Sequence, residues 1–117
     1  STTGAYLARI QEYENMPVAP ELEGLQNRLK SMASKYAACV TQITEAKDQE
    51  LLDFCARRLV EMAAHIIMGH LMVQDASKSD LFSESAQVYV RYAEAEVEKH
   101  INFIRKFDKD DLAYYRK

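Results

Sequence analysis

Three stretches of the sequence repeat a spacing of apolar residues that one side of an α-helix can bury. In each stretch, positions follow one another in alternating steps of three and four residues, and nearly all of them are apolar. Because an α-helix turns once in about 3.6 residues, such positions share one face. The three sets are Leu22, Leu25, Leu29, Met32, Tyr36, Cys39 and Ile43; Leu52, Cys55, Leu59, Met62, Ile66, Gly69 and Val73; and Ala86, Val90, Ala93, Val97, His100, Ile104 and Phe107. With a shorter helix before them, they predict an all-α fold: an antiparallel up-down bundle of four helices whose first helix is the shortest.

The chain is long enough for such a bundle to be one domain. A chain of 117 residues buries roughly two-thirds of the surface that it exposes when unfolded, which supports a core without disulfides or metals. Its 3 glycines and 2 prolines leave few helix breakers. We therefore expect residues 1–117 to form a single helical domain, with the charged residues 108–117 as a tail. Tyr114 and Tyr115 in that tail are candidates for docking on another part of a larger protein.

The two prolines separate a short first helix from the rest of the chain. That helix is expected from Thr3 to Asn15, with Thr2 or Thr3 as its N-cap. Its apolar face carries Tyr6, Ile10 and Tyr13. Residues 16–20 should form an extended connector, because a proline removes a backbone donor and disfavours helical angles in the residue before it. The second proline suits the first turn of the next helix, which we expect to start near Glu21.

The apolar positions change phase between the second and third helices, although no glycine or proline separates them. If the first set continued past Ile43, polar residues would face the core, whereas the apolar residues resume at Leu51. A short turn over residues 44–48, with Thr44 or Asp48 as cap of the next helix, explains the change. The alternative is one unbroken helix of about fifty residues whose buried face changes sides midway.

The third helix has a wider apolar face than a two-helix seam needs, so we expect it to be the most buried. The additional apolar residues are Leu51, Phe54, Ala63, Ile67, Met68 and Leu71. Most of the methionines lie on or beside the apolar sets of the second and third helices, which indicates core filling. Residues 77–80 should link the third helix to the fourth, with Ser79 or Asp80 as cap. The fourth helix should end near Phe107.

The spacing of the histidines argues against a metal site. His65 and His70 lie about 140° out of line on a helix, so they cannot both reach one ion. Glu61 and His65 share a face, but di-iron bundles use a glutamate with a histidine three residues later, a spacing that the sequence lacks. We interpret Glu61 and His65 as a surface or interface pair of small energetic value.

His100 differs from the other histidines because it occupies a position of the third apolar set. A ring buried there needs a hydrogen-bond partner, and we expect a tyrosine, a carboxylate or a backbone group. Glu94, Glu96 and Glu98 resemble an acidic cluster, but residues at two-residue spacing spread around a helix, so we expect them to be solvated. The sequence lacks a glycine-rich phosphate loop, a nucleophile elbow and a Cys-x-x-Cys pair. We assign no catalytic, cofactor-binding or metal-binding residue.

Charge and cysteine usage narrow the class of protein further. The net charge is −3 and basic residues are interleaved with acidic ones, so we expect neither a nucleic-acid nor a membrane partner. No apolar run approaches the roughly 20 residues of a membrane-spanning helix. Cys39 and Cys55 fall on apolar positions, and we expect reduced thiols in a cytoplasmic protein. The chain starts at Ser1 without an initiator methionine, so we expect an excised domain or a processed protein.

Part of the sequence resembles a known family. The passages Met62–Ala76, Phe82–Ala86 and Tyr92–His100 resemble the C-terminal extension of a bacterial acyl-CoA dehydrogenase family. The resemblance covers most of the chain from about Gly24 to Phe107. It implies a parent oxidoreductase that binds FAD, removes two hydrogens from the α and β carbons of an acyl-CoA, and passes electrons to an electron-transfer flavoprotein. The catalytic carboxylate and flavin contacts of such an enzyme would lie upstream of this chain, so none is assigned here.

On this interpretation, the chain contributes a helical packing surface and no chemistry of its own, with the remainder of the dehydrogenase chain as its partner. A second hypothesis is a stand-alone helical interaction module that forms a homodimer through the apolar face of the third helix. A metal-binding bundle is disfavoured because the ligand spacing is missing. The reading frame upstream of Ser1 separates the first two hypotheses, since only the first requires a flavoenzyme there.

Overall fold

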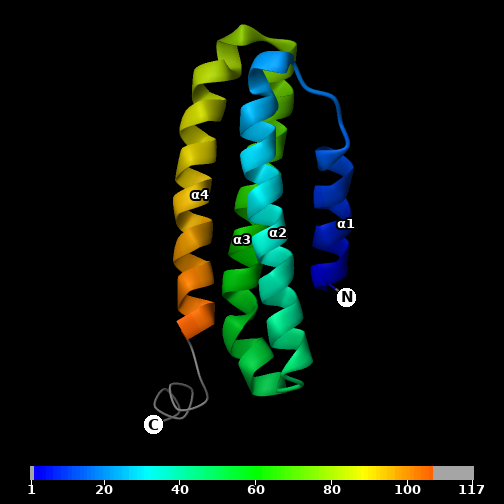
Figure 1. Ribbon diagram of the computed structural model, residues 1–117, viewed down its shortest axis with the longest axis vertical. Coiled ribbons are helices and arrows are strands. Elements are labelled where there is room, and N and C mark those ends of the chain that lie inside the picture. The colour runs from blue at the N-terminus through cyan, green and yellow to red at the C-terminus, as the bar shows by residue number, and fades with distance from the viewer. Residues whose placement is uncertain (1, 107–117) are drawn as a thin grey trace.

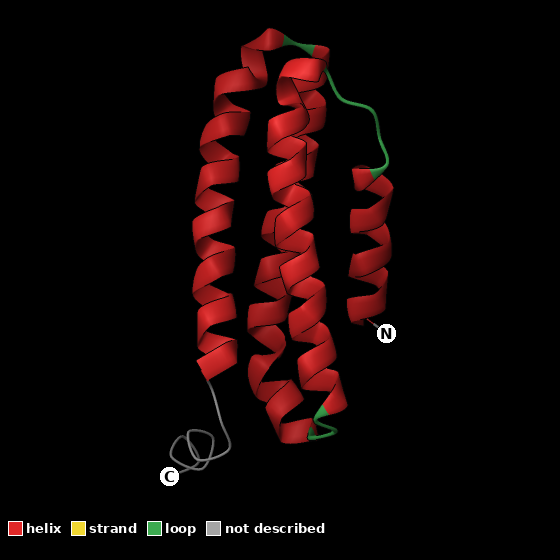
Figure 2. Cartoon of the chain, in the orientation of Figure 1, coloured by secondary structure: helices red, strands yellow, loops and turns green. Residues whose placement is uncertain are grey.

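The computed structural model describes residues 2–106, and the regular structure in that part of the chain is helical. Its α-helices are Thr2–Glu14 (α1), Glu23–Glu45 (α2), Gln49–Lys78 (α3) and Ser83–Lys106 (α4). Two short 3-10 helices, Pro20–Leu22 (η1) and Asp80–Phe82 (η2), precede α2 and α4 (Figure 2). The all-α prediction is confirmed. The predictions for Phe107, Tyr114, Tyr115 and the tail lie outside the described residues.

The helices run alternately up and down along one long axis, as expected for an up-down bundle (Figure 1). α2, α3 and α4 pack against one another, and the shorter α1 packs against α3 and α2 on the side away from α4. The molecule is elongated, with extents of 51 × 24 × 16 Å. Within the described part of α1, the buried side chains are Ile10 and Tyr13. The fold is therefore a core formed by α2, α3 and α4, with α1 packed against the outside of that core.

The apolar sets of the sequence form the core of the bundle. Within residues 2–106, Leu25 and Leu52 are partly buried, and the other positions of the three sets are buried. α3 contacts each of the other α-helices and both 3-10 helices. In this part of the chain, none of the helices combines the length and apolar character that crossing a bilayer requires.

Gly69 marks a close approach between α2 and α3. A Cβ atom added at Gly69 would lie 2.5 Å from Cδ2 of Leu29, which is closer than two carbon atoms can pack. A side chain at this position would therefore force the terminal methyl group of Leu29 to move. The glycine of this apolar set thus lies where α2 and α3 are in close contact.

A tight turn separates α2 from α3, and the unbroken helix is excluded. Lys47 has a φ of 50°, in the left-handed region, and directs the chain out of α2. Asp48 then caps α3, since its Oδ1 accepts hydrogen bonds from the backbone N–H groups of Glu50 and Leu51 at 3.0 and 3.2 Å. Thr44, the other candidate for the cap, lies in the last turn of α2.

The connector before α2 is extended as predicted, and polar contacts hold it in place. Gln26, buried in α2, donates from Nε2 to the backbone oxygen of Met16 at 2.9 Å, and the N–H of Ala19 donates to Oγ of Ser77 at 3.0 Å. Pro20 begins η1, so the helical path starts there and becomes α-helical at Glu23. The N-cap prediction for α1 was wrong, because Thr2 and Thr3 already lie inside the helix.

The link between α3 and α4 has the predicted length but begins two residues later than predicted. Ser77 and Lys78 still belong to α3, and Asp80 begins η2, so Ser79 alone joins the two helical segments. Ser79 is extended, and its Oγ accepts a hydrogen bond from the N–H of Leu81 at 3.3 Å. Its own N–H still donates to the carbonyl of Asp75, and this bond extends α3 further than the polar sequence suggested.

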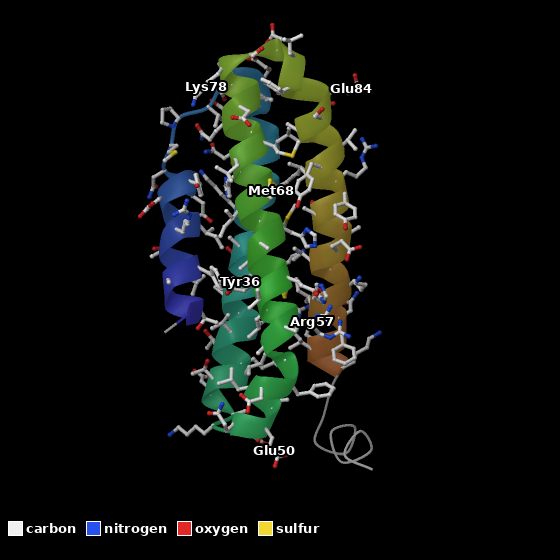
Figure 3. All side chains as sticks on the ribbon, turned by 180° about the vertical axis from the view of Figure 1, so that it is seen from behind. Tyr36, Glu50, Arg57, Met68, Lys78 and Glu84 are labelled. Carbon is white, nitrogen blue, oxygen red and sulfur yellow. The ribbon has the colours of Figure 1, made fainter. Side chains whose placement is uncertain are left out.

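Part of the wide apolar face of α3 is exposed. Ala63 is buried and Ile67 is partly buried, but the exposed fractions of Met68 and Leu71 are 46% and 38%. In the view of Figure 3, with α3 in front, Met68 lies on the outward side of that helix. The expectation that the methionines of α2 and α3 fill the core therefore holds for Met32 and Met62 but is wrong for Met68, because the neighbouring helices leave this strip of α3 uncovered.

Candidate functional site

The polar and exposed apolar groups of α3 and α4 gather along the groove between these two helices. At one end lies a cavity of about 370 Å³, here called the basic pocket; it is lined by Phe54, Arg57, Arg58, Glu61, Lys99, His100 and Phe103. At the other end lies an open cavity of about 550 Å³, here called the apolar groove; it is lined by Met72, Leu81, Glu84, Ser85, Val88, Tyr89 and Tyr92. The two cavities have different chemistry.

His100 is the buried polar centre of the basic pocket. Its Nδ1 lies 3.1 Å from Nη1 of Arg58. Since a guanidinium can only donate, Nδ1 must be the acceptor, and the ring proton of the neutral histidine is assigned to Nε2. Nε2 lies 3.0 Å from Oε2 of Glu61. A carboxylate therefore lies close to the ring, but Nε2 makes no hydrogen bond in this geometry. The contact of Nδ1 with Arg58 was not foreseen.

The surroundings of His100 favour its neutral form. Burial lowers the pKa of His100 below its ordinary value of 6.5; the carboxylate of Glu61 opposes this change, and the positive charge of Arg58 adds to it. Arg58 is itself fixed from two sides, because its guanidinium also lies 3.6 Å from the centre of the Phe103 ring. The result is a guanidinium and a neutral imidazole held in one geometry at the wall of a cavity.

The predicted pair of Glu61 and His65 was wrong. Glu61 contacts His100 on α4, and its Oε1 accepts from Nε of Arg57 at 3.2 Å. His65 turns to a different partner, because its Nδ1 lies 3.1 Å from the hydroxyl of Tyr89. Both α3 side chains face α4 and contact a polar group there, and Glu61 also accepts a hydrogen bond from Arg57 on its own helix.

His70 lies on the other side of α3, against α1. Its ring is 1% exposed and stacks on Tyr13, with ring centres 5.9 Å apart. Burial, together with the positive charge of Lys30, lowers the pKa of His70 to about 4. His65 and His70 thus point to different helices, as their spacing implied. Over residues 2–106, no group of three or more His, Cys, Asp or Glu side chains is arranged to hold a metal ion.

The two cysteines are free and buried, at Cys39 of α2 and Cys55 of α3. Burial raises the pKa of both thiols above its ordinary value. A thiol of this kind is protonated at neutral pH and is a poor nucleophile. The cysteines therefore belong to the core and not to a reactive site.

The acidic residues of α4 were wrongly expected to be merely solvated. Glu94 accepts two hydrogen bonds from Arg28 of α2, at 2.7 and 3.2 Å, and this contact lowers the pKa of its carboxyl group. Glu98 pairs with Lys35, also of α2, at 2.5 Å. Glu94 and Glu98 are four residues apart and therefore face the same neighbouring helix. They form a polar border between α4 and α2.

The apolar groove is the most exposed apolar part of the described surface. Leu81 is 87% exposed, Val88 59% and Tyr92 51%. Tyr92 also packs its ring edge-on against His65, with ring centres 5.4 Å apart. Side chains of this kind together on one face, rather than scattered, mark a contact surface. Sequence reasoning missed it, because Leu81 and Val88 lie outside the periodic apolar sets.

Comparisons with known proteins agree with this description. A family model described as "Acyl-CoA dehydrogenase C terminal" matches residues 2–112. The match thus includes the first helix, which the resemblance in the sequence did not. Among solved structures, the chain is similar to an acyl-CoA dehydrogenase family protein from Porphyromonas gingivalis, with 49% sequence identity, a TM-score of 0.87, and coverage of 92% of this chain and 93% of that chain. A comparison with curated proteins gave no match.

Proposed function

Because the chain belongs to the acyl-CoA dehydrogenase C-terminal family, we propose that it is a non-catalytic domain of an FAD-dependent enzyme that oxidises an acyl-CoA to a 2-enoyl-CoA. In this proposal the chemistry lies in the remainder of the enzyme, which would pass electrons to an electron-transfer flavoprotein. The domain contributes a rigid helical surface for packing or for subunit assembly. A cytoplasmic location fits the two free, buried cysteines.

The described residues do not fit a flavin. FAD needs an elongated, largely enclosed cleft with donors for its pyrophosphate. The larger cavity here is an open groove with apolar side chains and the carboxylate of Glu84, which would repel a pyrophosphate. The flavin is therefore assigned to the remainder of the parent enzyme, and no step of its chemistry is attributed to this chain.

The observation that carries the packing role is the apolar groove. Leu81, Val88 and Tyr92 are exposed in the isolated domain, and covering them would remove apolar surface from water at about 25 cal/mol per Å². We assign this face of α3 and α4 to the contact with the remainder of the dehydrogenase. The reading frame directly upstream of Ser1 gives the first test: a flavoenzyme there supports the assignment, and a start codon immediately before Ser1 contradicts it.

The second test uses a charged substitution in the groove. Val88→Glu should leave the melting temperature of the isolated domain nearly unchanged, because Val88 is 59% exposed. In the full-length enzyme the same change should lower the melting temperature or weaken subunit assembly, since it would bury an unpaired charge. Val60→Glu is the matched control, because Val60 is 43% exposed on α3 but lies outside the groove. Equal effects of both changes in the full-length enzyme would place the contact elsewhere.

A homodimer through α3 is the second candidate, favoured by the exposure of Met68 and Leu71. Ile67 packs partly on the core, so Ile67→Glu would disturb the fold as well as a dimer. Met68→Glu is the cleaner variant. If the isolated domain sediments as a dimer, this change should give monomers; a dimer that persists would exclude the α3 face as the contact.

A further inference from the structure

One cation of the basic pocket, Arg58, has no carboxylate partner among the described residues. Three cationic side chains line it, Arg57, Arg58 and Lys99, against the single carboxylate of Glu61. Figure 3 shows Arg57 beside the groove between α3 and α4. The pocket is separate from the apolar groove, and the packing role proposed above does not use it.

The carboxylates near the pocket are already engaged. Glu61 divides its two oxygens between Arg57 and His100. Glu96 pairs with Lys99 at 2.7 Å. Within the described residues, the contacts of Arg58 are the acceptor nitrogen of His100 and the face of Phe103, and neither carries a negative charge. A half-buried guanidinium without a counter-charge is costly, and an anion would relieve that cost.

The guanidinium of Arg58 is already held in a fixed position from which it could bind an anion. The ring of Phe103 and Nδ1 of His100 hold its guanidinium, and only Nη1 is used in the contact with His100. A guanidinium has five N–H donors in a planar fork, so donors remain that match two oxygens of one anion. Because these contacts already fix the side chain, an anion would have to order little more of it on binding.

We propose that the basic pocket binds a small phosphate ester, with its phosphate on Arg58 and its organic part against Phe54. A phosphate group carries a charge of about −1.5 to −2 at neutral pH, so it can pair with Arg58 and also attract Arg57 and Lys99, which Glu61 and Glu96 already pair. A carboxylate carries half of that charge. The volume of about 370 Å³ lies at the lower end of small-molecule sites and leaves room for more than a bare phosphate ion.

The experiment is calorimetric titration of the domain at low salt with three probes: phenyl phosphate, inorganic phosphate and benzoate. Phenyl phosphate should bind with saturation and more tightly than the other two, because it alone supplies both the dianion and a ring. Arg58→Gln should weaken its binding at least about tenfold, as expected for the loss of charge-assisted hydrogen bonds. Arg91→Gln, which removes an exposed cation on the same helix as Lys99 but outside the pocket, should leave binding unchanged.

A second variant keeps the test decisive if Arg58→Gln does not fold. Arg57 and Lys99 are exposed, so the double change of both to Gln should preserve the fold while weakening the binding of phenyl phosphate. Absence of saturable binding by the wild-type domain overturns the proposal. So does binding that the pocket variants and Arg91→Gln weaken equally, since that result indicates only non-specific attraction to positive charge.

Discussion

Gly69 and Gly24 give a matched test of close packing, because both lie in helices but only one faces a neighbour. A Cβ at Gly69 would meet Cδ2 of Leu29, whereas a Cβ at Gly24 meets nothing within 4 Å. Gly69→Ala should therefore destabilise the domain by about 1 kcal/mol net, since overpacking outweighs the gain in helix propensity. Gly24→Ala should stabilise it by up to about 0.5 kcal/mol. Denaturant unfolding measures both; a stabilising Gly69→Ala would mean that Leu29 moves freely.

His70 should make the domain less stable in mild acid. Its pKa is about 4 in the folded state and near 6.5 in an unfolded chain. Below pH 6.5 the unfolded chain binds a proton that the folded state does not, so stability is full above this pH and is lost as the pH falls towards 4. Between pH 7 and pH 5 the loss from this residue is about 2 kcal/mol.

His100 should act in the same direction, because its pKa is also lowered in the folded state. Urea unfolding of wild type, His70→Gln and His100→Gln at pH 7 and pH 5 measures how much each histidine contributes to the loss of stability in acid. Each variant should lose less stability than wild type on acidification, and the double variant should lose least. A double variant with the same pH dependence as wild type would show that the two buried rings do not carry it.

The sequence predicted which residues are buried better than it predicted which residues contact one another. The periodic positions, including His100, are nearly all buried because the period of one helix decides which face turns inward. The contacts between His100 and Arg58, and between His65 and Tyr89, depend on how far one helix is shifted along another. Nothing in the period of a single helix sets that shift, so these partners could not be predicted.

At the scale of elements, the side chain of Asp48 stabilises the turn between α2 and α3. Oδ1 of Asp48 satisfies two of the backbone N–H groups that begin α3. Asp48→Ala should lower stability by about 1 kcal/mol, while Asp48→Asn should cost much less, because asparagine caps nearly as well. Thermal unfolding of the two variants measures the difference. Equal losses would mean that the carboxylate charge, and not the cap, is what α3 requires.

Helix boundaries were predictable where a local signal coincides with a change of apolar phase. The α2–α3 turn has both, since the apolar positions shift and Asp48 supplies the cap. The α3–α4 link has only a polar run, and α3 continues through Ser77 and Lys78 to the single residue Ser79. A polar run on the exposed side of a helix can remain helical, and for this reason that boundary was misplaced.

At the scale of the whole molecule, α1 should be the least protected helix. It packs mainly against α3 and α2, on the outside of the three-helix core, and its described buried side chains are Ile10 and Tyr13. Opening α1 exposes less apolar surface than opening any other helix, so its amides should exchange faster than those of α2 to α4. Native-state hydrogen exchange resolved by fragment measures this. Protection of α1 equal to that of α3 would show that the four helices open only together.

The family was identified from the sequence, whereas the surfaces that the domain offers were not. Family resemblance rests on the order of apolar and small residues along the chain, and the match over residues 2–112 agrees with it. The apolar groove and the basic pocket arise only when α3 and α4 lie side by side, because each takes residues from both helices. Surfaces of this kind are properties of the packing and have no motif in either helix.

The up-down order of the helices determines at which end of the bundle each helix begins. The first and last described residues, Thr2 and Lys106, both lie towards the lower end of the bundle in Figure 1, whereas α4 begins at the upper end. Val88 is eighteen residues before Lys106, or roughly 25 Å along the helix axis. The apolar groove therefore lies at the opposite end of the bundle from Thr2, where α1 begins. If the proposed parent enzyme precedes α1, a contact through this groove would join parts of the protein that are far from that junction.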